Sequence, residues 1–312
     1  MKKISIVSSC LNEESNLDEL YKRVSIEWDK YKDKYEFEYI LLDNGSVDNT
    51  EAKLRQLAKK DKRIKVILNS RNFGQNASPL FGVINATGDA VICIASDLQD
   101  PPELIPDLIQ KWEEGNQLVL LRKTSSKESI FIFALRKLYY KILYKIADNG
   151  VELAENCTGS GLLDRKIVEE LKRNNDPEPY YRGLICEMGF KRAYVDFTQP
   201  VRAKGCSCNN LYSLYSIAML GITKFTKVPL RIMAIIGFLM SAVTFLLTII
   251  YLILKLVNWN AFSLGIAPII LGVTLFSSVQ LFCLGILGEY IGAIYTRVNT
   301  KPLVIVKEKI NF

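Results

Sequence analysis

Residues 88–103 read GDAVICIASDLQDPPE and carry the strongest structural signal in the chain. The apolar run at 90–94 predicts a buried strand, and Pro101-Pro102 predicts that a helix starts soon after it. Asp97 then falls at the tip of the strand, where a carboxylate can bind a divalent cation that also contacts a diphosphate. Taken alone, an aspartate at a strand end is more often a turn or cap residue, so both interpretations stay open.

The same alternation of strand and helix extends back to the N-terminus. Apolar runs predict strands at 4–8, 37–42, 64–68 and 90–94. Helical patterns lie between and after them, near 17–31, 51–60, 76–86 and 102–113. This order is typical of an α/β domain with a mostly parallel sheet, which binds ligands at the carboxyl ends of its strands. Polar side chains gather at those ends, at 12–14, 43–46 and 97–100.

The C-terminal part of the chain predicts a membrane domain. Of the 312 residues, 49% are hydrophobic and 23% are charged, and residues 232–288 carry the single charge of Lys255. Segments 232–254 and 265–288 each exceed the roughly 20 residues that cross a bilayer, so we expect a two-helix transmembrane hairpin. The alternative is a buried helical pair in a soluble core. The domains are then 1–228 and 229–312, the second ending in a short tail.

Basic residues predict the orientation of this hairpin. They flank both spans and are absent from the loop between them: Lys224, Lys227, Arg231, Arg297, Lys301, Lys307 and Lys309. Both termini and the α/β domain are therefore expected in the cytoplasm. Tyr290 and Tyr295 suit interfacial anchoring. A further segment, 129–147, interleaves apolar and basic residues, which predicts an amphipathic helix lying on the membrane; a helix docked on the sheet with a solvated basic face is the alternative.

Composition excludes several classes of function. The formal charge is +7, but 34 of the 40 basic and 31 of the 33 acidic residues precede residue 229, so the nearly neutral α/β domain is not expected to bind nucleic acid. Histidine is absent, which removes Ser-His and Cys-His pairs. The seven cysteines show no framework spacing and fit a reducing compartment, and Cys206 and Cys208 lack partners for a zinc site.

Several segments together carry a family resemblance. They are 12–14, 43–50, 71–75, 97–103, Gln199-Pro200 with Arg202 and Gly205, 221–223, and 228–231. In these motifs the chain resembles membrane-anchored family 2 glycosyltransferases, specifically polyprenyl-phosphate (bactoprenol) glycosyltransferases and, more distantly, dolichyl-phosphate mannose synthase. The resemblance spans nearly the entire chain.

The resemblance implies a GT-A (nucleotide-diphospho-sugar transferase) fold. It implies inverting transfer of a monosaccharide from a nucleotide-diphosphate sugar, UDP-glucose or a related UDP-hexose, to undecaprenyl or another polyprenyl phosphate. The reaction would take place on the cytoplasmic leaflet of the bacterial inner membrane. The implied substrate-binding residues are Asn12, Glu13, Asp43, Asp97, Gln99 and Arg202. Of these, Asp97 and Gln99 would hold Mg²⁺ or Mn²⁺, and Arg202 would contact phosphate. Lys204 is added as a candidate because it could supply the phosphate-binding charge that relatives carry at position 208.

The chain departs from the family pattern at three positions. Ala95 replaces the first acid of the usual Asp-x-Asp, Gly159 stands where relatives carry an aspartate often proposed as the base, and Cys208 stands where close relatives tend to have lysine. A phosphate monoester has a second pKa near ~6, so it needs positioning more than deprotonation. Glu187 is the candidate catalytic carboxylate if one assists, and a structural role is the more common one for such a residue.

Two other functions remain open at this stage. An elongating membrane glycan synthase is disfavoured by two spans and by the lack of a Gln-x-x-Arg-Trp run. A catalytically silent membrane scaffold of the same fold is suggested by Ala95 and Gly159. Small residues in the second span would permit a homo-oligomer through membrane helices: Gly272, Ser277, Ser278, Gly285 and Gly288.

Overall fold

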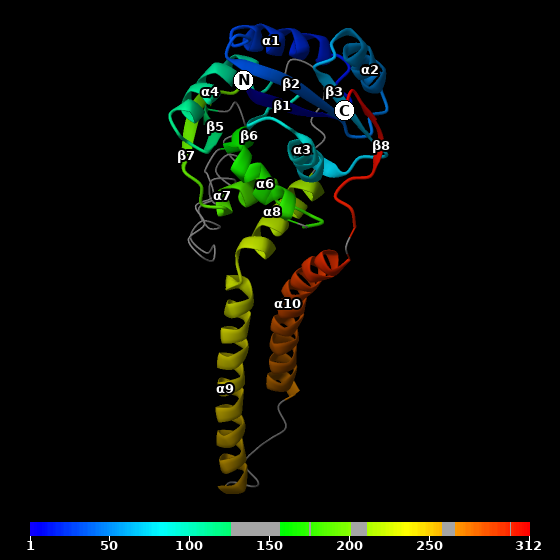
Figure 1. The fold of residues 1–312 in the computed structure, drawn as a ribbon. Coiled ribbons are helices and arrows are strands. Elements are labelled where there is room, and N and C mark those ends of the chain that lie inside the picture. Colours follow the sequence, from blue (N-terminus) through cyan, green and yellow to red (C-terminus); the bar gives the residue numbers. More distant parts are fainter. Residues whose placement is uncertain (126–156, 175, 201–210, 258–265, 300) are drawn as a thin grey trace.

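The protein consists of an α/β domain from which two long helices extend (Figure 1). This computed structural model describes residues 1–125, 157–174, 176–200, 211–257, 266–299 and 301–312. The predicted interfacial helix at 129–147 lies outside the described residues, as do Arg202 and Lys204.

An eight-stranded sheet forms the centre of the domain, in the order β7-β5-β6-β4-β1-β2-β3-β8. Its strands are β1 (Lys2–Cys10), β2 (Tyr35–Asp43), β3 (Ile64–Asn69), β4 (Ala90–Cys93), β5 (Leu118–Ser125), β6 (Cys157–Asp164), β7 (Arg192–Thr198) and β8 (Val306–Ile310). β1 is parallel to both β2 and β4, whereas β6 is antiparallel to β4 and β5. The predicted α/β class with a mostly parallel sheet is confirmed, as are the four predicted strands.

Helices cover both faces of this sheet, because side chains along the central strands alternate between two apolar clusters. On β2, Tyr39 and Leu41 face one cluster, while Ile40 and Leu42 face the other. The first cluster is covered by α1 (Leu17–Asp29), α2 (Thr50–Lys60), the 3₁₀ turn η1 (Pro102–Leu104) and α4 (Ile105–Glu113). The second is covered by α3 (Gly74–Asn85), α6 (Arg165–Arg173) and α7 (Tyr181–Glu187).

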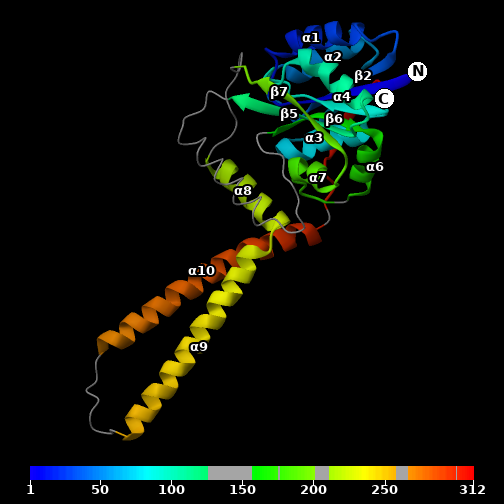
Figure 2. The same cartoon turned by 90° about the vertical axis from the view of Figure 1, so that its left-hand side faces the viewer.

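Three apolar helices follow the domain: α8 (Leu211–Phe225), α9 (Val228–Val257) and α10 (Ile266–Val298). Figure 2 shows α9 and α10 leaving the domain on the same side, beyond α8. Large apolar side chains on them are exposed, for example Phe238 at 76% and Leu281 at 69%. Within the described ranges one segment, Leu275–Val298, is long and apolar enough to cross a membrane, and α9 contributes the shorter stretch Val228–Met240. The helices are present, but the two-span hairpin is not confirmed.

Two tyrosines hold the C-terminal half of α10 to α8 and to the turn between α8 and α9. Tyr215 of α8 donates a hydrogen bond to Glu289 Oε1 at 2.8 Å, and the Tyr290 hydroxyl donates to the Thr226 carbonyl at 2.8 Å. Tyr290 is only 8% exposed. Tyr290 is therefore used in helix packing, and the predicted anchoring of Tyr290 and Tyr295 in the lipid interface stays a prediction.

The segment after α10 returns to the sheet. β8 pairs antiparallel with β3, and Asn311 donates two hydrogen bonds to the backbone carbonyls of Ala58 and Ile64, each at 2.8 Å. The predicted boundary at residue 228 assigned this segment to the membrane domain as a tail. That assignment misses an edge strand, because β8 completes the sheet of the α/β domain.

The amino edge of the sheet, where the parallel strands begin, is organised around the buried carboxylate of Glu38. Ser5 Oγ and Thr87 N donate to it at 2.5 and 2.6 Å, and the ammonium groups of Lys3 and Lys65 lie at 3.0 and 2.8 Å. Burial alone would raise the pKa of Glu38, but these donors outweigh it and lower the pKa to about 2. This carboxylate is fully compensated within the fold.

Candidate active site

The carboxyl edge of the sheet contains a topological switch point. β1 pairs with β2 on one side and with β4 on the other, so the connections after β1 and β4 diverge. In open α/β sheets a crevice forms outside the carboxyl ends of such strands, and ligands bind there. The three polar segments predicted from the sequence all follow strands that end at this edge, and two of them follow β1 and β4.

The turn after β4 presents Asp97 and Gln99 at this edge. Gln99 N donates to Asp97 Oδ1 at 3.1 Å, and both side chains are half-buried. Leu98 between them adopts a left-handed φ of 61° although its side chain is 7% exposed. A left-handed residue with a Cβ costs roughly 1–2 kcal/mol, so packing of Leu98 into the core holds a conformation that the backbone alone would not favour. The turn therefore directs its two polar neighbours away from the core.

Asp100 closes the same turn from the inside. It is 2% exposed, and it accepts hydrogen bonds from Ala95 N at 3.2 Å and from Ser160 Oγ at 2.5 Å. Burial raises the pKa of Asp100, which the Ser160 hydrogen bond only partly offsets. Asp100 thus ties the turn to the start of β6, and Asp97 and Gln99 are the members of the turn that remain accessible to a ligand.

Asn12, after β1, fixes the loop that follows β2. Its backbone N–H donates to Ser46 Oγ at 2.9 Å, and its side-chain oxygen accepts from Val47 N at 2.9 Å. Asn12 is exposed, with a left-handed φ of 57°. Its neighbour Glu13 is buried at 8% and accepts from Asn16 Nδ2 at 2.6 Å, at the start of α1. The structure brings Asn12 and Glu13 to the predicted edge, and Glu13 already has a partner within the fold.

Asp43 is the buried carboxylate at the end of β2. It is 2% exposed and accepts from Ser46 N at 3.2 Å. Burial raises the pKa of Asp43, hydrogen bonds from Ser46 lower it in part, and the nearby carboxylates Glu51 and Asp48 raise it further. Asp43 is therefore an incompletely compensated acid next to the switch point, suited to accept hydrogen bonds from a ligand.

Asn44 was quoted in the family motif but not predicted as a site residue, and it is the hub of this edge. Its Oδ1 accepts from Phe73 N at 2.9 Å and from Ser78 Oγ at 2.5 Å, and its Nδ2 donates to Asn72 Oδ1 at 2.9 Å.

Gly45, the residue after Asn44, has a φ of 76° and lies so close to Arg71 that a Cβ would be 2.6 Å from the Arg71 carbonyl carbon. The loops after β2 and β3 are thus held together by hydrogen bonds and close backbone packing. No local sequence pattern predicts these contacts.

The remaining predicted residues are placed differently. Gln99 Oε1 accepts from Gln199 Nε2 at 3.1 Å, which joins the Asp97 turn to the end of β7. Glu187 is exposed at the last residue of α7, and no hydrogen bond or ion pair among the described residues joins it to the Asp97 turn. The structure therefore places Asn12, Glu13, Asp43, Asp97 and Gln99 at the carboxyl edge, and the role of Glu187 stays a prediction.

The donor set at this edge is small. The described residues contain no group of three or more acidic, cysteine or histidine side chains placed to hold a metal ion. Asp100 is buried and engaged with Ala95 and Ser160, whereas Asp97 and Gln99 are half-buried, so the Asp97 carboxylate and the Gln99 amide are the oxygen ligands that this turn presents at the edge. These two fit a cation whose other ligands are water and substrate phosphates, as Mg²⁺ prefers, rather than a metal held by protein alone.

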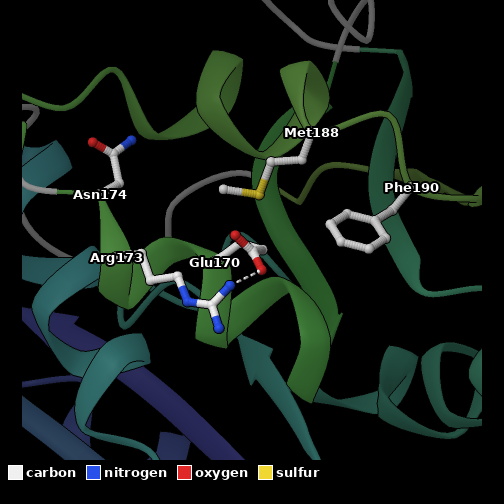
Figure 3. Close-up of a pocket in the computed structure, with 5 residues that line it drawn as sticks. All are labelled: Glu170, Arg173, Asn174, Met188 and Phe190. Atoms are coloured by element: carbon white, nitrogen blue, oxygen red, sulfur yellow. Dashed lines mark hydrogen bonds and ion pairs between the residues drawn. The ribbon is translucent and has the colours of Figure 1, made fainter.

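A separate pocket lies between α6 and the turn after α7 (Figure 3). It is lined by Glu170, Arg173, Asn174, Met188 and Phe190. Arg173 Nη1 donates to Glu170 Oε1 at 2.7 Å, so the two charged side chains of this pocket neutralise each other. None of the carboxyl-edge residues lines this pocket, and we do not assign the active site to it.

The mostly parallel sheet, with its polar loops and acidic turn at the switch point, defines a GT-A-like α/β domain. Residues 5–172 match the family Glycosyl transferase family 2. The chain belongs to this family and is a glycosyltransferase.

Relatives extend over almost the whole chain. A Bacillus subtilis protein named uncharacterized glycosyltransferase YkcC is 36% identical over 97% of this chain and 93% of its own length. The SfII prophage-derived bactoprenol glucosyl transferase of Shigella flexneri is 34% identical over 98% of each chain. Among solved structures, glucosyl-3-phosphoglycerate synthase from Mycobacterium tuberculosis is 20% identical over 71% of this chain and 76% of its own, with a TM-score of 0.46.

Proposed function

We propose that this protein transfers a monosaccharide from a nucleotide-diphosphate sugar, UDP-glucose or a related UDP-hexose, to a polyprenyl phosphate at the cytoplasmic leaflet of the bacterial inner membrane. The observation that carries the proposal is the Asp97–Gln99 turn at the switch point of a domain that continues into exposed apolar helices. Relatives named bactoprenol glucosyl transferase match over 98% of the chain, which supports the acceptor class and glucose as the sugar.

The proposed reaction is a direct displacement. An oxygen of the lipid phosphate attacks the anomeric carbon, the bond from that carbon to the β-phosphate oxygen breaks, and UDP leaves with the electron pair, which inverts the configuration. The attacking phosphate is mostly a dianion at pH 7, so no protein base is required. Asp43 and Asn12 would orient the nucleoside, and Asp97 and Gln99 would hold a divalent cation at the diphosphate. When bound, this cation would neutralise charge on the departing diphosphate.

The return of β8 supports a two-span topology. β8 pairs with β3 of the same sheet that precedes α9, so the segments before α9 and after α10 lie on one side of any membrane. A chain that leaves and returns to one side must cross the bilayer an even number of times. If α10 crosses, α9 must cross as well, which agrees with a hairpin and with both termini in the cytoplasm.

The test is transfer by purified full-length protein in detergent, with radiolabelled UDP-glucose and undecaprenyl phosphate. We expect one labelled lipid product carrying a single sugar, formed only with Mg²⁺ or Mn²⁺. The Asp97→Asn variant should lose turnover by roughly 100- to 1,000-fold with an unchanged unfolding temperature. Asp107→Asn on α4 removes an exposed charge and is the matched control.

Other outcomes discriminate the alternatives. A product with several sugars would indicate an elongating glycan synthase. Failure of the wild type to make any lipid-soluble product with any nucleotide sugar, together with an Asp97→Asn variant that behaves like wild type in UDP binding, would indicate a silent scaffold and overturn the proposal.

A further inference from the structure

Arg182, the second residue of α7, lies directly against the backbone of β6. A Cβ placed on Gly159 would be 2.7 Å from Arg182 Cγ, 3.2 Å from Nε and 3.4 Å from Cδ. Gly159 also has a φ of 87°, which disfavours any residue with a side chain. The stem of the arginine therefore occupies the space that a side chain at position 159 would need.

This contact is at the carboxyl edge. β6 is antiparallel to β4, and Gly161 pairs with Cys93, the last residue of β4. Between Gly159 and Gly161 lies Ser160, whose hydroxyl donates to Asp100 in the turn that carries Asp97. Arg182 thus contacts Gly159, the neighbour of Ser160, which holds the Asp97 turn through its hydrogen bond to Asp100.

The helix α7 fixes the arginine in this position. Tyr181 and Gly183, on either side of it, are buried, whereas Arg182 itself is exposed. Tyr181 packs in the same apolar cluster as Cys93, at the end of β4. Because the backbone on both sides is buried, the root of the Arg182 side chain has little freedom, and its stem rests on Gly159.

The charge of Arg182 is not neutralised by the part of the chain that the structure describes. No ion pair to a carboxylate is formed there by Arg182, whereas Arg122 binds both carboxylate oxygens of Asp196, at 2.6 and 2.9 Å. A guanidinium whose stem is immobilised while its donors remain available is suited to bind two oxygens of a phosphate.

We propose that Arg182 is an anion-binding residue of the active site and that the missing side chain of Gly159 leaves the space that positions the Arg182 stem. The Arg182 guanidinium would bind two oxygens of a phosphate group, either in the diphosphate of the sugar donor or in the phosphate of the lipid acceptor. This inference rests on the proposed function for the identity of these two substrates, and the experiment separates the two sources.

The variants are Arg182→Ala, Arg182→Lys, Gly159→Ala and the double variant. Loss of a charge-assisted bidentate contact should raise the KM of one substrate by about 10-fold or more, with a smaller increase for Arg182→Lys, which keeps the charge but loses the fork. Gly159→Ala should displace the arginine and raise the same KM. In the Arg182→Ala background the three atoms nearest the added methyl are gone, so the double variant should be no worse than Arg182→Ala alone.

Gly115→Ala controls for backbone strain. Gly115 has the same φ of 87°, but nothing lies within 4 Å of its Cβ position. It shares the strain of Gly159→Ala without the clash, so we expect wild-type KM values from it. Unfolding temperatures of all variants, measured in the same detergent, show whether each is folded.

Two measurements distinguish the sources of phosphate. UDP affinity by calorimetry with Mg²⁺ reports the donor, and the KM for farnesyl phosphate in micelles reports the acceptor. The inference is overturned if Arg182→Ala leaves UDP affinity and both KM values within about twofold of wild type, or if Gly159→Ala has its full effect in the double variant. If the wild type makes no lipid-linked sugar, the proposed function fails, and unchanged UDP affinity in Arg182→Ala then overturns this inference separately.

Discussion

Both edges of the sheet contain buried carboxylates, but the pKa values of these carboxylates are shifted in opposite directions. At the amino edge, Glu38 is bonded by Lys3 and Lys65 and by three further donor groups of Ser5 and Thr87, which lower its pKa to about 2. At the carboxyl edge, burial raises the pKa of Asp43 and of Asp100. A compensated buried acid stabilises the fold, whereas an incompletely compensated one costs stability, and such a cost is typical of residues kept for binding or catalysis.

The pH dependence of stability follows with opposite signs. Glu38 has a lowered pKa, so its contribution is present above its ordinary pKa of 4.5 and is lost as the pH falls toward about 2. Asp43 and Asp100 have raised pKa values, so their contribution is present below the ordinary pKa of 3.8 and is lost as the pH rises through the raised values.

The largest effect on stability is expected from Glu38→Gln. Removing this charge leaves Lys3 and Lys65 without their shared partner, and at pH 7 we expect a loss of about 3 kcal/mol in the free energy of unfolding. The KM values and the turnover of the folded protein should not change, because Glu38 lies at the edge opposite the proposed active site. Urea unfolding in mild detergent, followed by the fluorescence of the buried Trp28 and Trp112, measures the loss.

The pH profile of the same variant is its internal check. The difference between wild type and Glu38→Gln should shrink as the pH falls from about 4.5 toward about 2. A difference that stays constant across this range would mean that the ionised carboxylate is not the source of the stability, and the contrast between the two edges would be lost.

A smaller effect, with the opposite pattern, is expected from Asp43→Asn. The amide oxygen can still accept from Ser46 N, and the uncompensated charge is gone, so unfolding free energy should be unchanged or higher by up to about 1 kcal/mol at pH 7. UDP affinity should fall by about 10-fold, since a charged acceptor for the nucleoside is lost. Calorimetric titration of UDP and urea unfolding are the two readouts. Destabilisation as large as that of Glu38→Gln would contradict the assignment of Asp43 to binding.

The first half of the sheet was predictable because its signals are local. Strands such as the one at 90–94 are continuous apolar runs between helical patterns, and parallel strands end at one edge, which places Asp43 and Asp97 there without knowledge of side-chain contacts. β8 was not predictable in this way. Its pairing partner β3 lies more than two hundred residues earlier, and the strand Val306–Ile310 is short and rich in lysine.

The site was predictable in its composition and not in its packing. Asn12, Asp43 and Asp97 follow from motifs at strand ends. The contact between Arg182 and Gly159 depends on how α7 lies on β6, and the strain at Leu98 depends on its burial, so neither has a signature in spacing. Glu187 stays a prediction, since it is exposed at the last residue of α7.

The smallest effect is expected from Glu103→Gln, which tests whether burial rather than pairing makes Glu38 important. Arg23 binds both oxygens of Glu103, at 2.8 and 2.5 Å, as good a geometry as any at the amino edge. The Glu103 side chain is 51% exposed, against 3% for Glu38, so water already solvates its charge. The same substitution should therefore cost no more than about 0.5 kcal/mol, and less at high salt. Equal losses from both variants in urea unfolding would show that the effect of Glu38 comes from ion pairing and not from its burial. In that case, the raised pKa values of Asp43 and Asp100 would no longer support placing the active site at the carboxyl edge.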